Sequence, residues 1–556
     1  MRRVLLALSV CLAAASCTVV SNSDSDSDAG VGGASGAGGT GAGGTAGAAG
    51  QSGSACGDVP VEGRCVDNTT IEKCMSSPAD DKPPSVVKAT CKGGMVCRSN
   101  ANGASCEIEG ECAPGTSECA GDHNVRTCQA GKWIVTTCDT GLCKAKPGYG
   151  ATCIQNAGGQ SYPITGVLTY EHPPVKEDRT DYDFDNLVVQ GANTVIVVAY
   201  DGDEFIGSAY TTASDDPKDD GRFTIEATKA PTANTWLWFF PMFFNEDGSP
   251  QVAVAHPSTY TYSNLESKDY WYWSVDTKGA SDVGTVLIKI ADGSGALYFY
   301  QLLAYGMSQS MALAPQVKPF NVLGLWEQNG QFDCGNGTCY VPKGWGATVK
   351  YDGGEDLYQG AVLIAGTEDT PHQWSASVIL HEFGHYMMDA YSRSPAEAGK
   401  HNTTSLEPPG QAWSEGWASF YGQMTLGQPI YFDQQNGTRW WFDISQPKSS
   451  VPMPDPNGAI DQQMAELANA AMLWHLWDPG TTGAAEEAWD LASVEPALIW
   501  KAFSSTRMTQ QNRGYTKVDM VDYLDSLRCE GVSEQQVSSI TGHYGFPYDN
   551  AQLCAQ

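Results

Sequence analysis

Hydrophobic and polar positions change their spacing several times along the chain, and each change marks a different kind of structure. From 159 to 257, short alternating runs such as TVIVVAY at 194–200 and RFTIEA at 222–227 lie between turn residues. This pattern predicts antiparallel strands. From about 320 onward, a strand at 361–366 (AVLIAG) is followed by a run with helical spacing from Gln373 to Tyr391. Strands followed by helices predict an α/β (α+β) domain, which we place at 258–556.

The N-terminal segment has neither pattern. Residues 1–17 consist of Met-Arg-Arg, an apolar run and Ser16-Cys17, the layout of a bacterial lipoprotein signal in which Cys17 carries the lipid. An ordinary signal peptide, with no lipid on Cys17, is the alternative. Residues 18–55 are rich in Ser, Asp, Gly and Ala, which predicts a flexible tether. We expect export, either as a cell-surface or outer-membrane lipoprotein or to the extracellular medium, with membrane attachment only through the lipid.

Cysteines are concentrated between 56 and 153, where a six-cysteine unit occurs twice, in repeat 1 (56–108) and repeat 2 (109–158). Large apolar residues are few there, so disulfides must supply most of the stability, and their pairing stays open. Zinc binding by these cysteines is the alternative, but paired C-x2-C spacings are absent. The repeats are expected to bind a surface ligand or to act as a spacer. Two further pairs are expected to staple a tight turn and the C-terminal tail: Cys334 with Cys339, and Cys529 with Cys554.

The segment 206–227 resembles the hairpin of small prealbumin-like sandwich domains, so a small antiparallel, sandwich-like domain is expected over 159–257. The chain is therefore predicted to be multidomain. Its formal net charge of -32 argues against nucleic acid or an anionic membrane surface as a partner, since both would repel it. Carboxylate-rich turns leave calcium open as a ligand, but neither 215–221 nor 352–356 has the spacing of a known calcium loop.

Three polar residues interrupt the apolar helix predicted from Gln373 to Tyr391, namely His381, Glu382 and His385. One helical turn separates the two imidazoles, so both can place a nitrogen about 2.0–2.1 Å from one zinc ion. Two buried histidines beside a carboxylate with no ion would carry a large desolvation penalty. The pattern therefore predicts a zinc site.

A catalytic zinc needs a third protein ligand and an open fourth position. The metzincin arrangement is excluded, because Met388 and Tyr391 stand where it requires Gly and His. A second predicted helix at 411–423 (QAWSEGWASFYGQ) offers Glu415, thirty residues after His385. A surface or capping role for Glu415, and ligation by His401 instead, remain alternatives.

HEFGH followed by SEGWASF resembles the gluzincin zinc metallopeptidases, particularly the thermolysin-like and fungalysin-like families, over Gln373 to Asp478. The resemblance implies that His381, His385 and Glu415 bind one zinc ion and that Glu382 is the general base. It also implies a zincin-type catalytic domain, with the active-site helix at the bottom of a cleft and the preceding strand available to an extended substrate.

The chain departs from these families in the residues around the ligands. Where they often have an Asp that supports a zinc histidine, this chain has Ser419, and Asp389 is an alternative support from the first helix. The histidine that stabilises the oxyanion in thermolysin-like enzymes has no recognisable counterpart, and His475 is the best substitute. Other candidates for that role are Tyr386, Tyr421 and His543.

Together these features predict an exported zinc endopeptidase acting on protein or peptide substrates. The main rival is a non-catalytic surface protein that binds through its repeats on a zincin-derived scaffold. Retention of Glu382 favours the enzyme, because zinc binding alone needs only the three ligands. A zinc hydrolase with a substrate other than a peptide is a third interpretation.

Overall fold

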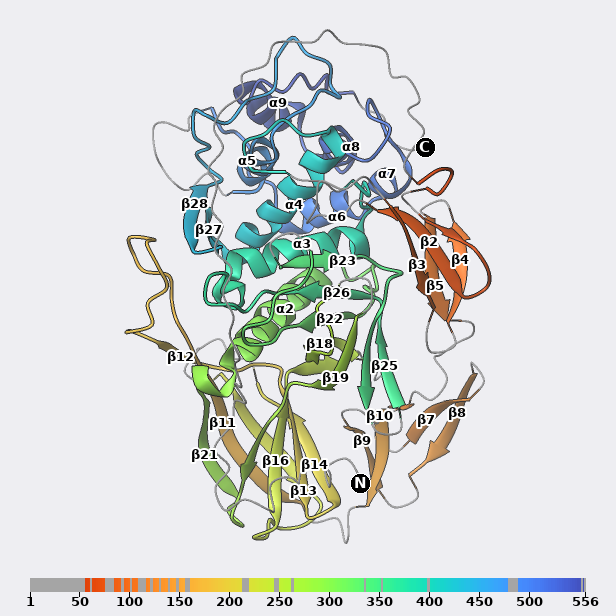
Figure 1. The fold of residues 1–556 in the computed structure, drawn as a ribbon, viewed down its shortest axis with the longest axis vertical. Coiled ribbons are helices and arrows are strands. Elements are labelled where there is room, and N and C mark those ends of the chain that lie inside the picture. The colour runs from red at the N-terminus through yellow and green to blue at the C-terminus, as the bar shows by residue number, and fades with distance from the viewer. Residues whose placement is uncertain are drawn as a thin grey trace, which may run out of the picture.

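The computed structural model covers most of the chain after the tether. It describes residues 56–60, 63–75, 85–91, 95–100, 103–108, 117–120, 124–129, 132–138, 141–146, 150–155, 161–212, 220–244, 250–261, 265–334, 337–351, 354–397, 401–478, 489–551 and 554. The expected signal peptide, Cys17 and the tether lie outside these residues. Figure 1 shows a β-domain at one end, helices at the other, a sheet between them and the cysteine-rich strands along one side.

The two cysteine-rich repeats form small antiparallel sheets cross-linked by disulfides. In repeat 1, Cys56 is bonded to Cys74 and Cys65 to Cys97, and in repeat 2, Cys119 is bonded to Cys143. The strands are β1 (Arg64–Cys65), β2 (Thr70–Met75), β3 (Ser85–Thr90), β4 (Met95–Asn100), β5 (Gly103–Ile108), β6 (Ser117–Cys119), β7 (Asn124–Gln129), β8 (Lys132–Thr137), β9 (Gly141–Lys146) and β10 (Gly150–Gln155). Their clusters of buried residues are small and consist largely of cysteine, as a disulfide-stabilised unit requires.

The β-domain consists of two packed sheets. One has the order β12-β11-β15 with β21 added in parallel to β11, and the other has the order β14-β13-β16-β20. These strands are β11 (Tyr162–His172), β12 (Val188–Gly191), β13 (Ile196–Asp201), β14 (Glu204–Tyr210), β15 (Arg222–Ala227), β16 (Thr235–Phe240), β20 (Trp273–Asp276) and β21 (Asp282–Ile288). Alternate residues of β15 are buried, and its apolar face shares a core with β13 and β14. The segment 206–227 thus connects the two sheets, and its two arms are joined by backbone hydrogen bonds from Thr212 to Arg222 and from Thr228 to Ile206.

The central sheet has eight strands in the order β23-β26-β22-β18-β19-β24-β25, with β17 also paired to β18. The strands are β17 (Met242–Phe244), β18 (Pro250–Pro257), β19 (Glu266–Tyr270), β22 (Val322–Leu325), β23 (Cys339–Val341), β24 (Ala347–Tyr351), β25 (Gly354–Tyr358) and β26 (Gly360–Leu363). The edge strand β23 runs antiparallel to β26 and follows the Cys334–Cys339 disulfide. The boundary expected at residue 257 does not separate the sheets, because β18 belongs to the central sheet while β20 and β21 return to the β-domain.

Helices cover one side of the central sheet and continue into a helical end (Figure 1). Helix α2 (Ser294–Leu313) contacts β18, and α3 (Ala376–Tyr391) contacts β23 and β26. Helix α4 (Pro409–Leu426) packs on α3, and α5 (Glu466–Trp477) packs on α4. The remaining elements are η3 (Ile290–Asp292), η4 (His372–Trp374), the hairpin β27 (Ile430–Gln435) and β28 (Thr438–Asp443), and the helices α6 (Pro496–Phe503), α7 (Thr506–Gln510), α8 (Met520–Cys529) and α9 (Glu534–His543). Among the described helices, none combines the length and the apolar character needed to span a membrane.

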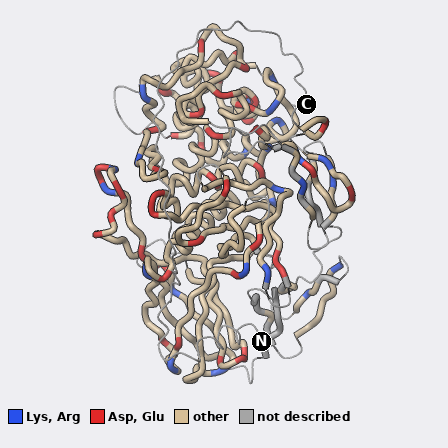
Figure 2. The backbone as a smooth tube through the Cα atoms, in the orientation of Figure 1, with Lys and Arg blue, Asp and Glu red and all other residues tan. Residues whose placement is uncertain are grey.

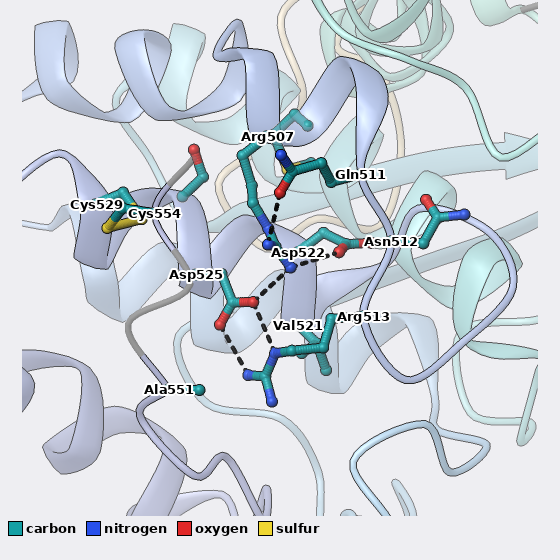
Figure 3. Close-up of polar contacts among 12 residues, drawn as sticks. Arg507, Gln511, Asn512, Arg513, Val521, Asp522, Asp525, Cys529, Ala551 and Cys554 are labelled. Carbon is teal, nitrogen blue, oxygen red and sulfur yellow. Dashed lines mark hydrogen bonds and ion pairs between the residues drawn. A yellow bond between two sulfur atoms is a disulfide. The ribbon is translucent and has the colours of Figure 1, made fainter. Parts of the chain in front are cut away.

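The helical end is tied together by buried ion pairs (Figure 3). The fully buried carboxylate of Asp525 on α8 accepts hydrogen bonds from Arg507 at 2.7 Å and from Arg513 at 2.7 and 2.8 Å. The tail beside this cluster is covalently fixed, since Cys554 is bonded to Cys529 at the end of α8. Charges are otherwise spread over the whole chain, with acidic positions grouped in the protruding loop between β11 and β12 (Figure 2).

Candidate metal centre

Helix α3 places His381 and His385 on one face, one turn apart. The helix begins where the Ser375 side chain accepts a hydrogen bond from the Val378 amide at 3.3 Å, a typical N-cap contact. Its apolar residues are buried against the sheet and α4, which fixes the direction in which the imidazoles point. The two rings lie edge to face with their centroids 4.9 Å apart.

Helix α4 brings Glu415 to these histidines. Glu415 is only 8% exposed, on a helix whose residues from 409 to 423 are all buried. Gly384 and Ala418 form a close backbone contact between α3 and α4, because a Cβ added at Gly384 would lie 2.8 Å from the Cα of Ala418. The absence of a side chain at Gly384 therefore sets the separation between the two ligand-bearing helices.

Three potential ligand atoms form a nearly equilateral triangle. The Oε2 atom of Glu415 lies 3.2 Å from Nε2 of His381 and 3.3 Å from Nε2 of His385, and the two Nε2 atoms are 3.3 Å apart. Tetrahedral coordination with bonds of about 2.0–2.1 Å requires ligand atoms about 3.3–3.4 Å apart. The donor set and its spacing therefore fit one zinc ion, with a fourth position left open.

The outer nitrogens of both histidines face hydroxyl groups of α4. Nδ1 of His381 is 3.1 Å from Oγ of Ser419, and Nδ1 of His385 is 3.3 Å from Oγ of Ser414. Ser419 was predicted from the sequence as a possible support for a zinc histidine. Ser414, which directly precedes Glu415 on the same helix, was missed. Both partners are neutral hydroxyl groups, so neither contact supplies the carboxylate that zinc histidines commonly have as a partner.

Asp389 lies elsewhere. Its Oδ2 atom accepts hydrogen bonds from the Tyr340 hydroxyl and the Lys343 amide, both at 2.8 Å, so it holds α3 to the segment around β23. The expectation that Asp389 supports a zinc histidine is corrected accordingly, since one helical turn carries it past His385 toward the sheet edge.

His475 is also engaged away from the triangle. Its Nδ1 atom is 2.9 Å from Asp490, and its Nε2 atom is 2.9 Å from the carbonyl oxygen of Ser445. The residue is 1% exposed, and both ring nitrogens are occupied by acceptors. An imidazole held in this way has no N–H left for an oxyanion, so we do not retain His475 in that role.

The three other candidates for that role are packing residues in this structure. Tyr386 is buried and donates its hydroxyl hydrogen bond to the carbonyl oxygen of Phe320. Tyr421 is 1% exposed and packs against Phe383. The ring of His543 is stacked on Trp489, with 3.5 Å between their centroids.

Tyr431 on β27 borders the site and was missed from the sequence. Its ring stands edge-on to His381 with 6.1 Å between centroids, and Phe442 stacks on it at 4.8 Å. Burial, followed by nearby carboxylates that include Glu382 and Glu415, raises the pKa of Tyr431 well above its usual value. The phenol is therefore a neutral hydrogen-bond donor near the proposed base. The signal in the sequence was only an aromatic run, which more often marks a core.

His401 reaches Glu415 from the loop between α3 and α4. Its Nε2 atom is 3.7 Å from Oε1 of Glu415, and its Nδ1 atom is 2.8 Å from Oε2 of Glu466. The charge of Glu415 raises the pKa of His401 to about 10, with Glu466 adding to this against the effect of burial. His401, considered from the sequence as a rival ligand, thus faces Oε1 of Glu415, whereas the two helix histidines face Oε2.

The protein groups of the site are electrostatically coupled. Burial lowers the pKa of His385, but the charges of Glu415 and Glu382 outweigh it and raise the pKa overall. Burial raises the pKa of Glu415, but the positive charges of His385 and His401 hold it well below its usual value. The carboxylate is therefore ionised at neutral pH, as a metal ligand must be.

A comparison with known protein families found a match in the part of the chain that contains the candidate metal centre. A family model described as the Mycolysin C-terminal domain matches residues 326–524, a range that contains α3, α4 and α5. The match points to a metallopeptidase family and implies zinc as the metal. Among curated proteins, no match was found.

Proposed function

We propose that this chain is a zinc-dependent endopeptidase in which His381, His385 and Glu415 bind the metal and Glu382 is the general base. The observation that carries the proposal is the ligand triangle, whose sides of 3.2–3.3 Å suit one tetrahedral zinc ion. Glu382 follows His381 directly on α3 and contributes to the raised pKa of both His385 and Tyr431, so its carboxylate lies near the triangle.

The chain's own residues can then perform acid–base chemistry on a peptide bond. When bound, zinc polarises the scissile carbonyl and lowers the pKa of a coordinated water. The Glu382 carboxylate accepts a proton from the attacking water and delivers it to the leaving amine nitrogen. We propose Tyr431, whose ring stands edge-on to His381, as the donor of a hydrogen bond to the carbonyl oxygen as negative charge develops on it. The strand that precedes α3 is β26, which is paired on both sides with β22 and β23 and is therefore not available to a substrate, so we propose that the edge strand β23, which contacts α3, offers backbone groups to an extended peptide.

The disulfides support the proposal of export. Bonded pairs in the repeats and at the C-terminus are typical of proteins from oxidising compartments. We propose a lipid on Cys17 as the membrane attachment and a surface ligand for the repeats. Neither an anionic membrane surface nor nucleic acid is proposed as a partner, because the net charge is -32.

The test compares the full-length chain with its Glu382→Gln variant in casein cleavage, with zinc content measured on both. Gln has the shape of Glu but cannot accept the proton, so kcat should fall by about 10²–10⁴-fold while zinc stays bound. Asp389→Asn is the matched control, because it changes another carboxylate of α3 whose contacts lead to Tyr340 and Lys343. It should retain activity.

Three results would contradict the proposal. Equal cleavage by the wild type and Glu382→Gln would exclude Glu382 as the base. Absence of zinc from the wild type would exclude the metal centre. Bound zinc with no cleavage of any protein substrate by the wild type would favour the binding protein, or a hydrolase with another substrate.

A further inference from the structure

Only one of the two oxygens of Glu415 faces the helix histidines. Oε2 lies 3.2 and 3.3 Å from the nitrogens of His381 and His385, whereas Oε1 faces His401. A carboxylate can bind zinc through one oxygen or through both, and the second mode would occupy the position that a catalytic site leaves open. The group that faces Oε1 therefore bears on how the metal is held.

His401 is itself fixed. Its Nδ1 atom is 2.8 Å from Glu466, the first residue of α5, whose side chain is 6% exposed. The loop that carries His401 is attached to the same end of α5 by backbone hydrogen bonds between Glu407 and Met464 and from Leu467 to Thr403. Because Nδ1 is engaged by Glu466, Nε2 is the nitrogen directed at Glu415.

The two histidine ligands and Glu415 have different kinds of polar partner. His381 and His385 face the hydroxyls of Ser419 and Ser414, which are neutral and single hydrogen-bonding groups. Glu415, in contrast, is followed outward by an imidazole and then by a second buried carboxylate. In metallopeptidases a carboxylate commonly supports a histidine ligand. In this chain a carboxylate, Glu466, instead supports the glutamate ligand through the imidazole of His401.

We propose that His401 and Glu466 are a positioning pair that keeps Glu415 bound to the metal through one oxygen and thereby sets the zinc affinity of the site. This inference rests on the proposed metal centre. His401 holds its Nε2 3.7 Å from Oε1 of Glu415, an electrostatic contact longer than a hydrogen bond, while Glu466 orients the imidazole and Oε2 faces His381 and His385. The pair acts through Glu415 and needs no contact with a substrate.

The test measures the zinc dissociation constant of the full-length chain by competition with a chromophoric chelator. His401→Ala should raise this constant by about 10–100-fold, the range seen when an outer partner of a ligand is removed. Glu466→Gln should give a smaller rise. His401→Gln should recover part of the affinity, because its amide N–H can face Oε1 of Glu415 although it carries no charge. In the metal-free form, His401→Ala should melt below the wild type, because buried Glu466 loses its partner, and the zinc dissociation constant measured below that transition separates positioning from a fold defect.

The matched control is His256→Ala. Its Nδ1 atom is 2.7 Å from Glu327, and its side chain is 33% exposed, as is that of His401, but it belongs to a different ion pair. It should leave the zinc dissociation constant unchanged.

Each other result overturns the inference. Unchanged affinity in His401→Ala with a fall in kcat would assign His401 to the reacting carbonyl. Two zinc ions on the wild type and one on His401→Ala would make His401 a ligand of a second metal. Unchanged affinity and unchanged kcat would leave the pair without a role at the site. Failure of the metal centre itself is distinguishable, because the wild type would then bind no zinc.

Discussion

Gly384 lies on α3 between His381 and His385, the two proposed zinc ligands, and gives the sharpest test of how the helices build the site. Replacing it by Ala adds a Cβ that would lie 2.8 Å from the Cα and 3.0 Å from the carbonyl oxygen of Ala418 on α4. Carbon atoms in favourable contact are about 3.5–4.0 Å apart, so the two helices must separate by about 0.7 Å or more. Both neighbouring atoms belong to the backbone, so no side-chain rotation can relieve the contact.

The displacement acts directly on the ligand triangle. Glu415 moves with α4, while His381 and His385 move with α3, so the sides of 3.2 and 3.3 Å would lengthen. With about 0.7 Å added they approach about 4 Å, beyond the roughly 3.3–3.4 Å of tetrahedral zinc coordination. Strain from overpacking is typically about 1–3 kcal/mol. If that strain falls on the zinc-bound form, the zinc dissociation constant rises about 5- to 150-fold.

Gly422→Ala is the control on the same helix interface. A Cβ at Gly422 would lie 3.4 Å from the amide nitrogen of His381 and 3.5 Å from the Cβ of Leu380, which are ordinary contacts. Because Ala is favoured over Gly in helices by about 1 kcal/mol, this variant should keep its zinc affinity and gain slightly in stability.

The assay is zinc competition together with thermal unfolding of the metal-free and zinc-loaded forms of both variants. Gly384→Ala should lose zinc affinity and most of the stabilisation that zinc provides, whereas Gly422→Ala should resemble the wild type. Wild-type zinc binding by Gly384→Ala would refute the reasoning, since the helices would then tolerate a side chain at the contact between Gly384 and Ala418. Equal losses in both variants would show that Gly384 has no special place in the interface.

Two further predictions concern the helical end. Asp525→Ala should lower the free energy of unfolding in urea by about 3–5 kcal/mol, because it leaves buried Arg507 and half-buried Arg513 without their shared carboxylate. Asp549→Ala, at a 55% exposed side chain, should lower it by less than about 1 kcal/mol, and similar losses in the two variants would contradict this expectation. Burial lowers the pKa of His475, but its bonds to Asp490 and the Ser445 carbonyl raise it by more, so its stabilisation is complete below about pH 6.5 and is lost as pH rises through the raised pKa. The melting temperature of His475→Asn should therefore fall below that of the wild type by more at pH 6 than at pH 9, and a difference that grows with pH would exclude this role.

The sequence by itself determined the features that depend on local spacing. A separation of four residues places His381 and His385 one turn apart on any helix, so the histidine pair could be read before the helix was seen. Glu415 followed from a second motif on a second helix. The pairs Cys334–Cys339 and Cys529–Cys554, considered from their positions at a turn and a tail, are joined in the structure.

Only the tertiary structure decided which residues surround the ligands. His401 and Glu466 are separated by 65 residues in sequence, and Tyr431 comes from a hairpin, so their meeting depends on how α4, α5 and β27 pack. His475 shows the same limit, since α5 is buried on almost all sides and periodicity does not tell which face meets the site. The boundary expected at 257 fails for the same reason. Strand β18, which precedes it, pairs with β22 in the central sheet, and β21, which follows it, pairs with β11 in the β-domain, because packing of a shared core brings together strands that are far apart in sequence. Local patterns fix what an element is and which groups it carries, whereas contacts over long sequence separations fix where those groups converge.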